Sequence, residues 1–295
     1  MKKIVVVGGA GFIGSNLVEA LVERGDDVHV IDNLCGGKKE NVHPKASFYE
    51  VDIRNYSDIE DIIKGADTVF HLAALPRVQY SIEHPIETNE VNVGGTLNVL
   101  VAANKGEVRR LVYSASSAAY GDQEVLPLKE NMEANPLSPY GLQKYIGEKY
   151  CKIFNDIYGL SAVSLRYFNA YGKNQDPEGP YSLVIGRFLK LKEEGENLTI
   201  FGDGEQTRDF VNVRDIVRAN ILAMESEKEV GGEVINIGGG KNCSIKKLAE
   251  LIGGEIEYLP ARIEPKNTLA DITKAKELLD WQPTVSLEEG IKELL

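Results

Sequence analysis

Cysteine and histidine are scarce in this sequence of 295 residues, and neither is spaced as a metal site requires. Cys35, Cys151 and Cys243 are odd in number and far apart, and no CxxC pair occurs. This pattern predicts neither a disulfide framework nor a zinc centre. The histidines show no ligand spacing either; they are His29, His43, His71 and His84. We therefore expect a protein without a metal.

Long hydrophobic runs and an excess of basic residues are also missing. No apolar stretch approaches the ~18 residues of a membrane span. The run 4–7 ends at Gly8, too early for the core of a signal peptide. We expect a cytoplasmic protein with no membrane partner. The net charge of −12 disfavours nucleic acid as a partner, because binding it needs clustered Lys and Arg.

The first half of the chain alternates strand and helix patterns. This order is typical of a parallel sheet covered by helices on both faces. Short apolar runs rich in β-branched residues mark the expected strands, at 4–7, 28–31, 48–51, 68–71, 111–114 and 162–167. Helix patterns lie between them, for example at 14–24 and 91–104.

We expect an α/β fold with two parts. Residues 1–170 should form a Rossmann-type, doubly wound parallel sheet that binds a dinucleotide. Residues 171–295 should form a smaller C-terminal α/β lobe that binds substrate. A strand near 234–238 should return from this part to the main sheet. Helix patterns after residue 171 lie at 214–224, 245–252 and 272–279.

A glycine-rich turn joins the first expected strand to the first expected helix. In such a turn the first glycine, Gly8, permits a tight bend, and the second, Gly11, lets the backbone approach a pyrophosphate. The third, Gly14, allows the helix to pack closely. The helix N-terminus would then face the phosphates with free N–H groups. The spacing is GxxGxxG rather than GxGxxG, and an ordinary strand-to-helix turn is the alternative interpretation.

Acidic residues at the ends of the next two strands favour the dinucleotide interpretation. Asp32 ends the second strand, about 20 residues after the turn, where a carboxylate can bind the ribose hydroxyls of adenosine. Because a carboxylate there repels a 2′-phosphate, the sequence favours NAD over NADP. Asp52 and Ile53 follow the third strand and are expected beside the adenine.

A helix that begins near Ser138 carries a candidate acid–base pair. Ser138 suits an N-cap and Pro139 a first turn. Tyr140 and Lys144 share one helix face because they are four residues apart. An ammonium favours the phenolate of a tyrosine, which is otherwise a poor base at neutral pH, so this pair can act as a general base. A surface tyrosine with a solvated lysine is the alternative.

Two further features surround that pair. Ser116 lies in the run 114–117, at the end of an expected strand, where ligands of parallel sheets bind; its hydroxyl could bond a substrate, whereas Ser114 and Ser117 suit turns or caps. The apolar residues of the helix predict a buried stripe on another face, away from the pair. They are Ile146, Tyr150, Ile153, Phe154 and Ile157.

Together these residues resemble the extended short-chain dehydrogenase/reductase family, in its UDP-hexose 4-epimerase and dehydratase branch. The resemblance runs almost from end to end. Its motifs are GGAGFIG at 8–14, DN at 32–33, DI at 52–53, HLAA at 71–74, NVGGT at 92–96, SASSAAYG at 114–121, YGLQK at 140–144, RYFNAYG at 166–172, FGDGEQTRDFVNV at 201–213 and ADITKAKELLDWQP at 270–283.

The resemblance implies a site made of three groups of residues. The catalytic residues would be Ser116, Tyr140 and Lys144. The contacts to NAD would be Gly8, Gly11, Phe12, Ile13, Gly14, Asp32, Asn33, Asp52, Ile53, Leu72, Ala73, Ala74, Asn92, Tyr140, Lys144 and Tyr167. The contacts to a UDP-sugar would be Ser116, Tyr140, Asn169, Val184, Phe201 beside the uracil, Arg208 on a phosphate, Arg262 and Thr268.

The stretch after Ser116 indicates which reaction of the family to expect. Dehydratases of the family carry an Asp-Glu pair where this chain has Ser117 and Ala118. Without those carboxylates, the remaining chemistry is epimerisation at C4 of a UDP-hexose with NAD. Two alternatives are an oxidoreductase with net NAD turnover and a non-catalytic NAD-binding regulator.

Three finer expectations follow from the same resemblance. The segment 262–266 lacks the glycine of the family's usual turn and is one residue shorter. Arg262 is the residue that corresponds to the arginine of that turn. Thr268 occupies the position where a bulky tyrosine resembles enzymes restricted to glucose and galactose, so this small residue predicts acceptance of N-acetylated sugars. The segments 77–82 and 180–185 resemble the same N-acetylhexosamine branch. Helices near 91–104 and 140–157 pair in relatives, which implies a homodimer.

Overall fold

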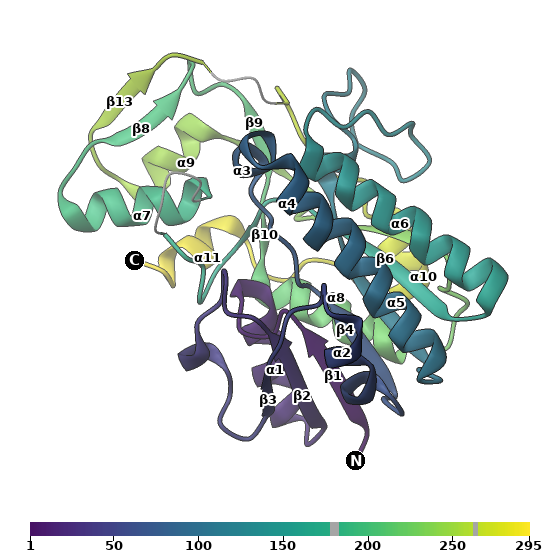
Figure 1. The fold of residues 1–295 in the computed structure, drawn as a ribbon. Coiled ribbons are helices and arrows are strands. Elements are labelled where there is room, and N and C mark those ends of the chain that lie inside the picture. Colours follow the sequence, from purple (N-terminus) through teal and green to yellow (C-terminus); the bar gives the residue numbers. More distant parts are fainter. Residues whose placement is uncertain (178–182, 262–264) are drawn as a thin grey trace.

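A single sheet of seven parallel strands forms the centre of the computed structural model, which describes residues 1–177, 183–261 and 265–295 (Figure 1). The strand order is β11-β6-β5-β4-β1-β2-β3, so the order reverses between β1 and β4, where ligands of such sheets bind. The strands are β1 (Lys3–Val7), β2 (Asp27–Asp32), β3 (Ser47–Glu50), β4 (Thr68–His71), β5 (Arg110–Ser116), β6 (Ser161–Tyr167) and β11 (Val234–Ile237).

Helices cover both faces of this sheet, as the doubly wound prediction requires. Ile4 and Val6 of β1 pack in the core under one set of helices, and Val5 and Val7 pack in the core under the other. A strand buried on both faces has no polar side, which explains its continuous apolar run. One face carries α1 (Phe12–Glu23), α8 (Val213–Glu225) and α10 (Thr273–Leu279); the other carries α2 (Tyr56–Ile63), α5 (Thr96–Lys105) and α6 (Pro139–Tyr158).

The C-terminal part contains a smaller lobe with its own buried cluster, which includes Phe188, Ile200 and Leu248. The lobe is built from α7 (Val184–Glu194), β8 (Leu198–Phe201), α9 (Ile245–Ile252), β13 (Ile256–Leu259) and α11 (Leu287–Lys292). Between β8 and α9 the chain returns to the main sheet, where β11 pairs in parallel with β6. No helix of the described residues is long and apolar enough to span a bilayer.

Short elements connect the sheet to the lobe. Two small ladders join β7 to β10 and β9 to β12. The remaining elements are η1 (Lys39–Asn41), α3 (Val78–Glu83), α4 (Pro85–Asn89), η3 (Ser117–Ala119), β7 (Ala170–Tyr171), β9 (Thr207–Asp209), β10 (Val211–Asn212) and β12 (Asn242–Ser244).

The helix expected over 91–104 differs at its start. Residues Glu90–Gly95 form a π-helical turn, η2, and the α-helix begins only at Thr96. The Thr96 hydroxyl donates to the carbonyl of Asn92 at 2.7 Å, and two glycines at 94 and 95 weaken the α-helical preference. Such π turns are found frequently at functional sites, and this one carries Asn92.

The prediction of which face of α6 is buried was wrong. Of the apolar stripe only Phe154 is buried, and Ile153 and Ile157 are exposed. The inner face instead carries Lys144 and Glu148, both buried, together with Gln143. Polar groups are stable there because each has a partner; Arg166 of β6, for example, donates to both carboxylate oxygens of Glu148, at 2.6 and 2.7 Å.

Close packing of α6 on β5 requires a glycine at position 147. A Cβ atom there would lie 2.2 Å from the Tyr113 hydroxyl of β5. Gly147→Ala should therefore lower the free energy of unfolding by about 1–3 kcal/mol, as overpacking of a core does. Gly94→Ala is the matched control, because a Cβ there meets no atom within 4 Å. Denaturant unfolding of both variants measures the effect, and equal midpoints would contradict this view of the contact.

Candidate active site

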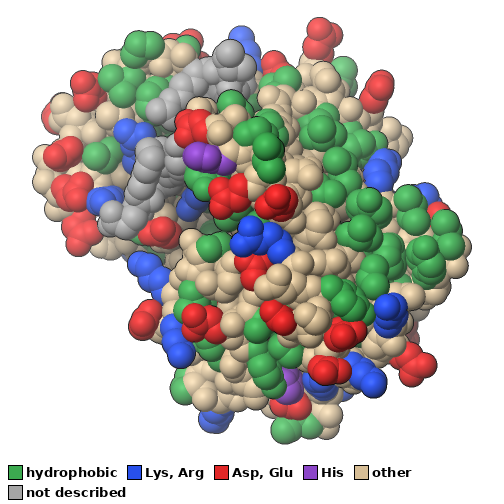
Figure 2. Space-filling view, viewed as in Figure 1, with side chains coloured by type: hydrophobic (Ala, Val, Ile, Leu, Met, Phe, Trp, Pro, Cys, Tyr) green, Lys and Arg blue, Asp and Glu red, His purple; other side chains and the backbone are tan. Residues whose placement is uncertain are grey.

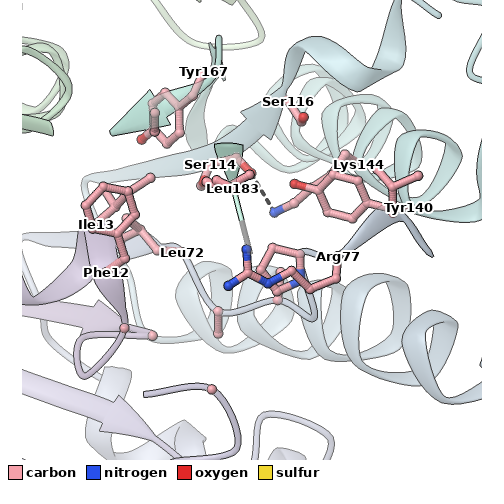
Figure 3. A pocket seen from close by; sticks show the side chains of 18 of the residues that line it. Phe12, Ile13, Leu72, Arg77, Ser114, Ser116, Tyr140, Lys144, Tyr167 and Leu183 are labelled. Atoms are coloured by element: carbon pink, nitrogen blue, oxygen red, sulfur yellow. Dashed lines mark hydrogen bonds between the residues drawn. The ribbon is translucent and has the colours of Figure 1, made fainter. Parts of the chain in front are cut away.

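A cavity of about 1340 Å³ opens at the carboxyl ends of the sheet strands, beside the point where the strand order reverses. Its walls come from the loops that follow β1, β2, β4, β5 and β6, from the start of α6, and from the lobe side through Arg208 and Thr268. Figure 3 shows the side chains that converge on it. The residues expected to bind cofactor and substrate are thus collected mainly at one place.

The glycine turn after β1 forms one end of the cavity and is shaped for a dinucleotide. Gly8 has φ of +88°, and a Cβ there would lie 2.5 Å from the backbone of Ala73. A Cβ on Gly14 would lie 2.0 Å from the Gly8 carbonyl, so the helix can approach only without it. The first turn of α1, from Gly11, has no side-chain cap and lines the cavity. Its N–H groups therefore suit a pyrophosphate.

The acidic residues after β2 and β3 lie at the same end. Asp32 is held by the backbone, since its two carboxylate oxygens accept hydrogen bonds from Ala10 N at 2.9 Å and Leu34 N at 2.8 Å. Asn33 donates to Asp52 at 2.8 Å. The hydrogen-bonded Arg54 guanidinium lowers the pKa of Asp52 to about 2. Both carboxylates are thus fixed at this end of the cavity, which Ile53 also lines.

Ser116, Tyr140 and Lys144 meet in the middle of the cavity (Figure 3). Ser138 caps α6 as predicted, accepting from Gly141 N at 3.2 Å. The Ser81 hydroxyl accepts from Tyr140 N at 3.0 Å, so a second element also fixes the start of the helix. The Lys144 ammonium donates to the carbonyl of Ser114 at 2.7 Å.

Burial controls the ionisation of this pair. It lowers the pKa of Lys144 to about 8 and raises the pKa of Tyr140. A hydrogen bond with Ser116 and the positive charge of Arg77 lower the Tyr140 pKa in the opposite direction. The expectation from the sequence was that Lys144 supplies the favourable charge. In the structure its ammonium is bound to a backbone carbonyl, and Arg77 is the cation that acts on the phenol.

Asn92 does not line the cavity but lies directly behind it. Its amide accepts from Leu75 N at 2.7 Å and donates to Leu75 O at 3.1 Å. It also donates to Gln143 of α6 at 2.8 Å, and Gln143 donates to Thr88. Asn92 thus ties the loop after β4 to the helix that carries Tyr140. The other residues expected at the cofactor line the cavity, including Phe12, Ile13, Leu72, Ala73, Ala74 and Tyr167.

On the lobe side, Asn169, Arg208 and Thr268 line the cavity. Thr268 is buried, and its hydroxyl accepts from Asp209 N at 3.2 Å and from the Asn169 amide at 3.4 Å. The Asp209 carboxylate in turn accepts backbone hydrogen bonds at 2.6–3.2 Å, from Gly239, Gly240 and Ala270. This carboxylate therefore holds three segments of the substrate side together.

The remaining substrate residues are placed differently. Val184 begins α7 and Phe201 ends β8, and neither belongs to the part of the wall that the described residues form. The ring of Phe201 lies under the Arg187 guanidinium, at 5.5 Å. Arg262 lies outside the described residues, as do residues 180–182 of the segment 180–185.

Several cavity residues were missed from the sequence. Gly37 and Lys38 lie against the glycine turn, where a Cβ on Gly37 would be 2.7 Å from Ala10 C. Arg77 and Asp176 line the wall near Tyr140 and Asn169. Their position in the sequence could have indicated them, because each residue follows within a few positions of the end of a parallel strand. Among the described residues no group of three His, Cys, Asp or Glu is arranged for a metal ion.

A parallel sheet with a dinucleotide turn, an acidic residue after β2 and a Ser-Tyr-Lys set in one cavity is the arrangement of an NAD-dependent enzyme. The model of the NAD dependent epimerase/dehydratase family matches residues 4–238, and the chain belongs to this family. NAD is its cofactor, as the glycine turn and Asp32 predict.

Relatives of the chain match over nearly its whole length. A putative UDP-glucose 4-epimerase of Methanocaldococcus jannaschii is 42% identical, over 99% of this chain and 97% of that protein. The crystal structure of a Thermotoga maritima UDP-glucose 4-epimerase with UDP-glucose is 42% identical, with a TM-score of 0.94 over 98% and 96% of the chains. A Methanobrevibacter ruminantium UDP-N-acetylglucosamine 4-epimerase, in complex with UDP-N-acetylmuramic acid, is 39% identical, with a TM-score of 0.94 over 99% and 96%.

Proposed function

We propose that this enzyme interconverts UDP-hexoses at C4, with UDP-glucose and UDP-N-acetylglucosamine both as substrates. One observation carries the choice among reactions of the family. The positions where a dehydratase has its acid pair are Ser117 and Ala118, and both line the cavity next to Ser116. Neither side chain can act as the carboxylic acid and base of an elimination. A cytoplasmic location, expected from the sequence, belongs to the same proposal.

In this proposal each of the three central residues has a role. Tyr140, as phenolate, accepts the proton of the C4 hydroxyl, and its place on the first turn of α6 is fixed by Ser81 and Ser138. Ser116 bonds the C4 oxygen and holds it beside Tyr140. Lys144 lies one turn further along and orients the ribose of the nicotinamide. NAD, when bound, supplies the acceptor of the C4 hydrogen and returns it.

Epimerisation then requires that the oxidised sugar change its orientation in the cavity. The 4-keto sugar would rotate in the cavity so that the hydrogen returned to C4 adds to the face opposite the one it left, while Tyr140 returns the proton to the C4 oxygen. No net oxidation takes place. Incubation with UDP-glucose and with UDP-N-acetylglucosamine, followed by separation of the C4 epimers, tests this directly. Steady accumulation of NADH without epimer formation would instead indicate an oxidoreductase, and no change in either sugar would indicate a regulator.

Tyr140→Phe removes the proton acceptor while it keeps the ring. Turnover should fall by at least ~10²-fold, the usual contribution of a positioned acid–base group, with folding and NAD binding retained. Tyr145→Phe is the matched control, because Tyr145 lies on the same helix but does not line the cavity. Initial rates of epimer formation give the comparison, and near-normal turnover of Tyr140→Phe would exclude Tyr140 as the base.

Thr268 is expected to determine whether N-acetylated sugars enter. Its small side chain lines the cavity and accepts a hydrogen bond from the Asn169 amide. Thr268→Tyr should fill part of the cavity and lower the rate on UDP-N-acetylglucosamine by about tenfold or more relative to UDP-glucose, because pocket shape discriminates substrates through steric exclusion. Thr268→Ser keeps both the hydroxyl and the space, and should leave the ratio unchanged. A wild-type enzyme that converts UDP-glucose but not UDP-N-acetylglucosamine would refute this assignment.

The dimer predicted from the sequence is part of the same proposal. The outer face of α6 exposes Ile153 by 43% and Ile157 by 70%. Figure 2 shows hydrophobic side chains gathered on the side where Figure 1 places α5 and α6. Burial of such a surface in a two-fold contact removes apolar area from water.

Light scattering at micromolar concentration should give twice the mass of one chain. Ile157→Glu should shift the distribution toward single chains, because a carboxylate would be buried without a partner. Val125→Glu is the control, since Val125 is 65% exposed and belongs to neither helix. A single-chain mass for the unmodified protein would rule the dimer out.

A further inference from the structure

Arg77 places a guanidinium inside the cavity, close to the proposed base. It lies in the loop between β4 and α3, and its side chain is half-buried. Figure 3 shows its guanidinium directed toward the space that the Tyr140 hydroxyl and the Lys144 ammonium also face. Its guanidinium forms no hydrogen bond or ion pair with the residues that the structure describes. Removing a cation from water costs free energy when no partner compensates for the lost hydration.

Lys144 is another cationic side chain close to Tyr140. Lys144 is engaged by the Ser114 carbonyl, and burial lowers its pKa to about 8, so that it loses its charge within the range in which enzymes work. Burial lowers the pKa of Arg77 too, but a guanidinium stays protonated at any such pH. Burial raises the pKa of Tyr140, and the charge of Arg77 acts against that rise.

Other charged groups of the cavity do not replace Arg77. Glu83 of α3 and Asp176 after β7 line the wall, and neither side chain can carry a positive charge. The charge of Asp176 acts on Arg77 and favours its protonated form. Arg208 of β9 donates to the Thr207 carbonyl on the lobe side. Among the described residues, Arg77 is the guanidinium whose field reaches the Tyr140 phenol.

We propose that Arg77 is a positioning residue whose permanent positive charge stabilises the ionised form of Tyr140 that accepts the proton of the C4 hydroxyl. The inference rests on the proposed function, because it assigns Tyr140 as the base. Arg77 would thus be a second cation beside the Tyr-x-x-x-Lys pair, and it comes from the loop after β4. The side chain acts through Tyr140 and is not itself a proton donor or acceptor.

The test is the pH dependence of kcat in Arg77→Gln and Arg77→Lys. An active phenolate makes kcat rise with pH and then level off. Loss of the nearby cation disfavours the phenolate, so the rising limb should move to higher pH by about half a unit or more in Arg77→Gln, with most of the rate recovered at high pH. Arg77→Lys keeps a cation and should keep the limb near that of the unmodified enzyme.

Two comparisons separate this role from others. Arg24→Gln removes one positive charge at the far end of α1 and should leave the limb in place. If Arg77 instead binds the cofactor diphosphate or the sugar, Arg77→Gln will weaken NAD retention or raise KM while the limb stays where it was. An unmoved limb in Arg77→Gln, whatever happens to KM, overturns the proposal.

A second measurement does not depend on turnover. The ultraviolet titration of Tyr140 is obtained as the difference between the unmodified protein and Tyr140→Phe, and again between Arg77→Gln and the corresponding double variant. The midpoint should be higher in the Arg77→Gln background by the same half unit or more. This result would support Arg77 even if no UDP-hexose were epimerised, whereas equal midpoints would refute it even if epimerisation were observed.

Discussion

The close contact between α6 and β5 is the constraint on which the site depends. Gly147 lets the helix lie against Tyr113, and at that distance the Lys144 ammonium reaches the Ser114 carbonyl at 2.7 Å. An ammonium enclosed by apolar side chains without such an acceptor would destabilise the fold. The same contact places Tyr140 beside Ser116, because one residue begins the helix and the other ends the strand. Packing and chemistry are therefore set by one interface.

The cavity has two walls that are held by different means. The wall formed by the loops after β1, β2 and β4 is held by backbone contacts. Glycines allow the turn after β1 to lie against the loop after β4, and Asp32 accepts hydrogen bonds from two backbone N–H groups. The substrate wall is held by a buried carboxylate, Asp209, which accepts from three backbone N–H groups of distant segments. Next to it, the Thr268 hydroxyl accepts from the Asp209 backbone N–H and from the Asn169 amide. The two walls are therefore held by separate sets of hydrogen bonds.

The sequence was informative where a local pattern decides the structure. The apolar run of β1, the glycine turn and the Ser138 cap depend on neighbours in the chain, and the fold and the cofactor followed from them. The buried face of α6 could not be read in this way, because Lys144 and Glu148 are tolerated inside only by partners on β5 and β6, distant in sequence. The π turn at Glu90–Gly95 and the entry of Arg77 into the cavity likewise depend on tertiary contacts.

The return of β11 to the edge of the main sheet has a consequence for synthesis on the ribosome. Until residues 234–237 emerge, β6 is an uncovered edge, with backbone groups free to pair with another chain. The hydroxyl of Tyr167, at the end of β6, also waits for Asn220, which it meets at 2.9 Å. The nucleotide half therefore cannot be completed co-translationally by its own residues alone. Its last strand is delivered only after the first elements of the lobe, α7 and β8, have been made, so the two parts of the chain are completed together.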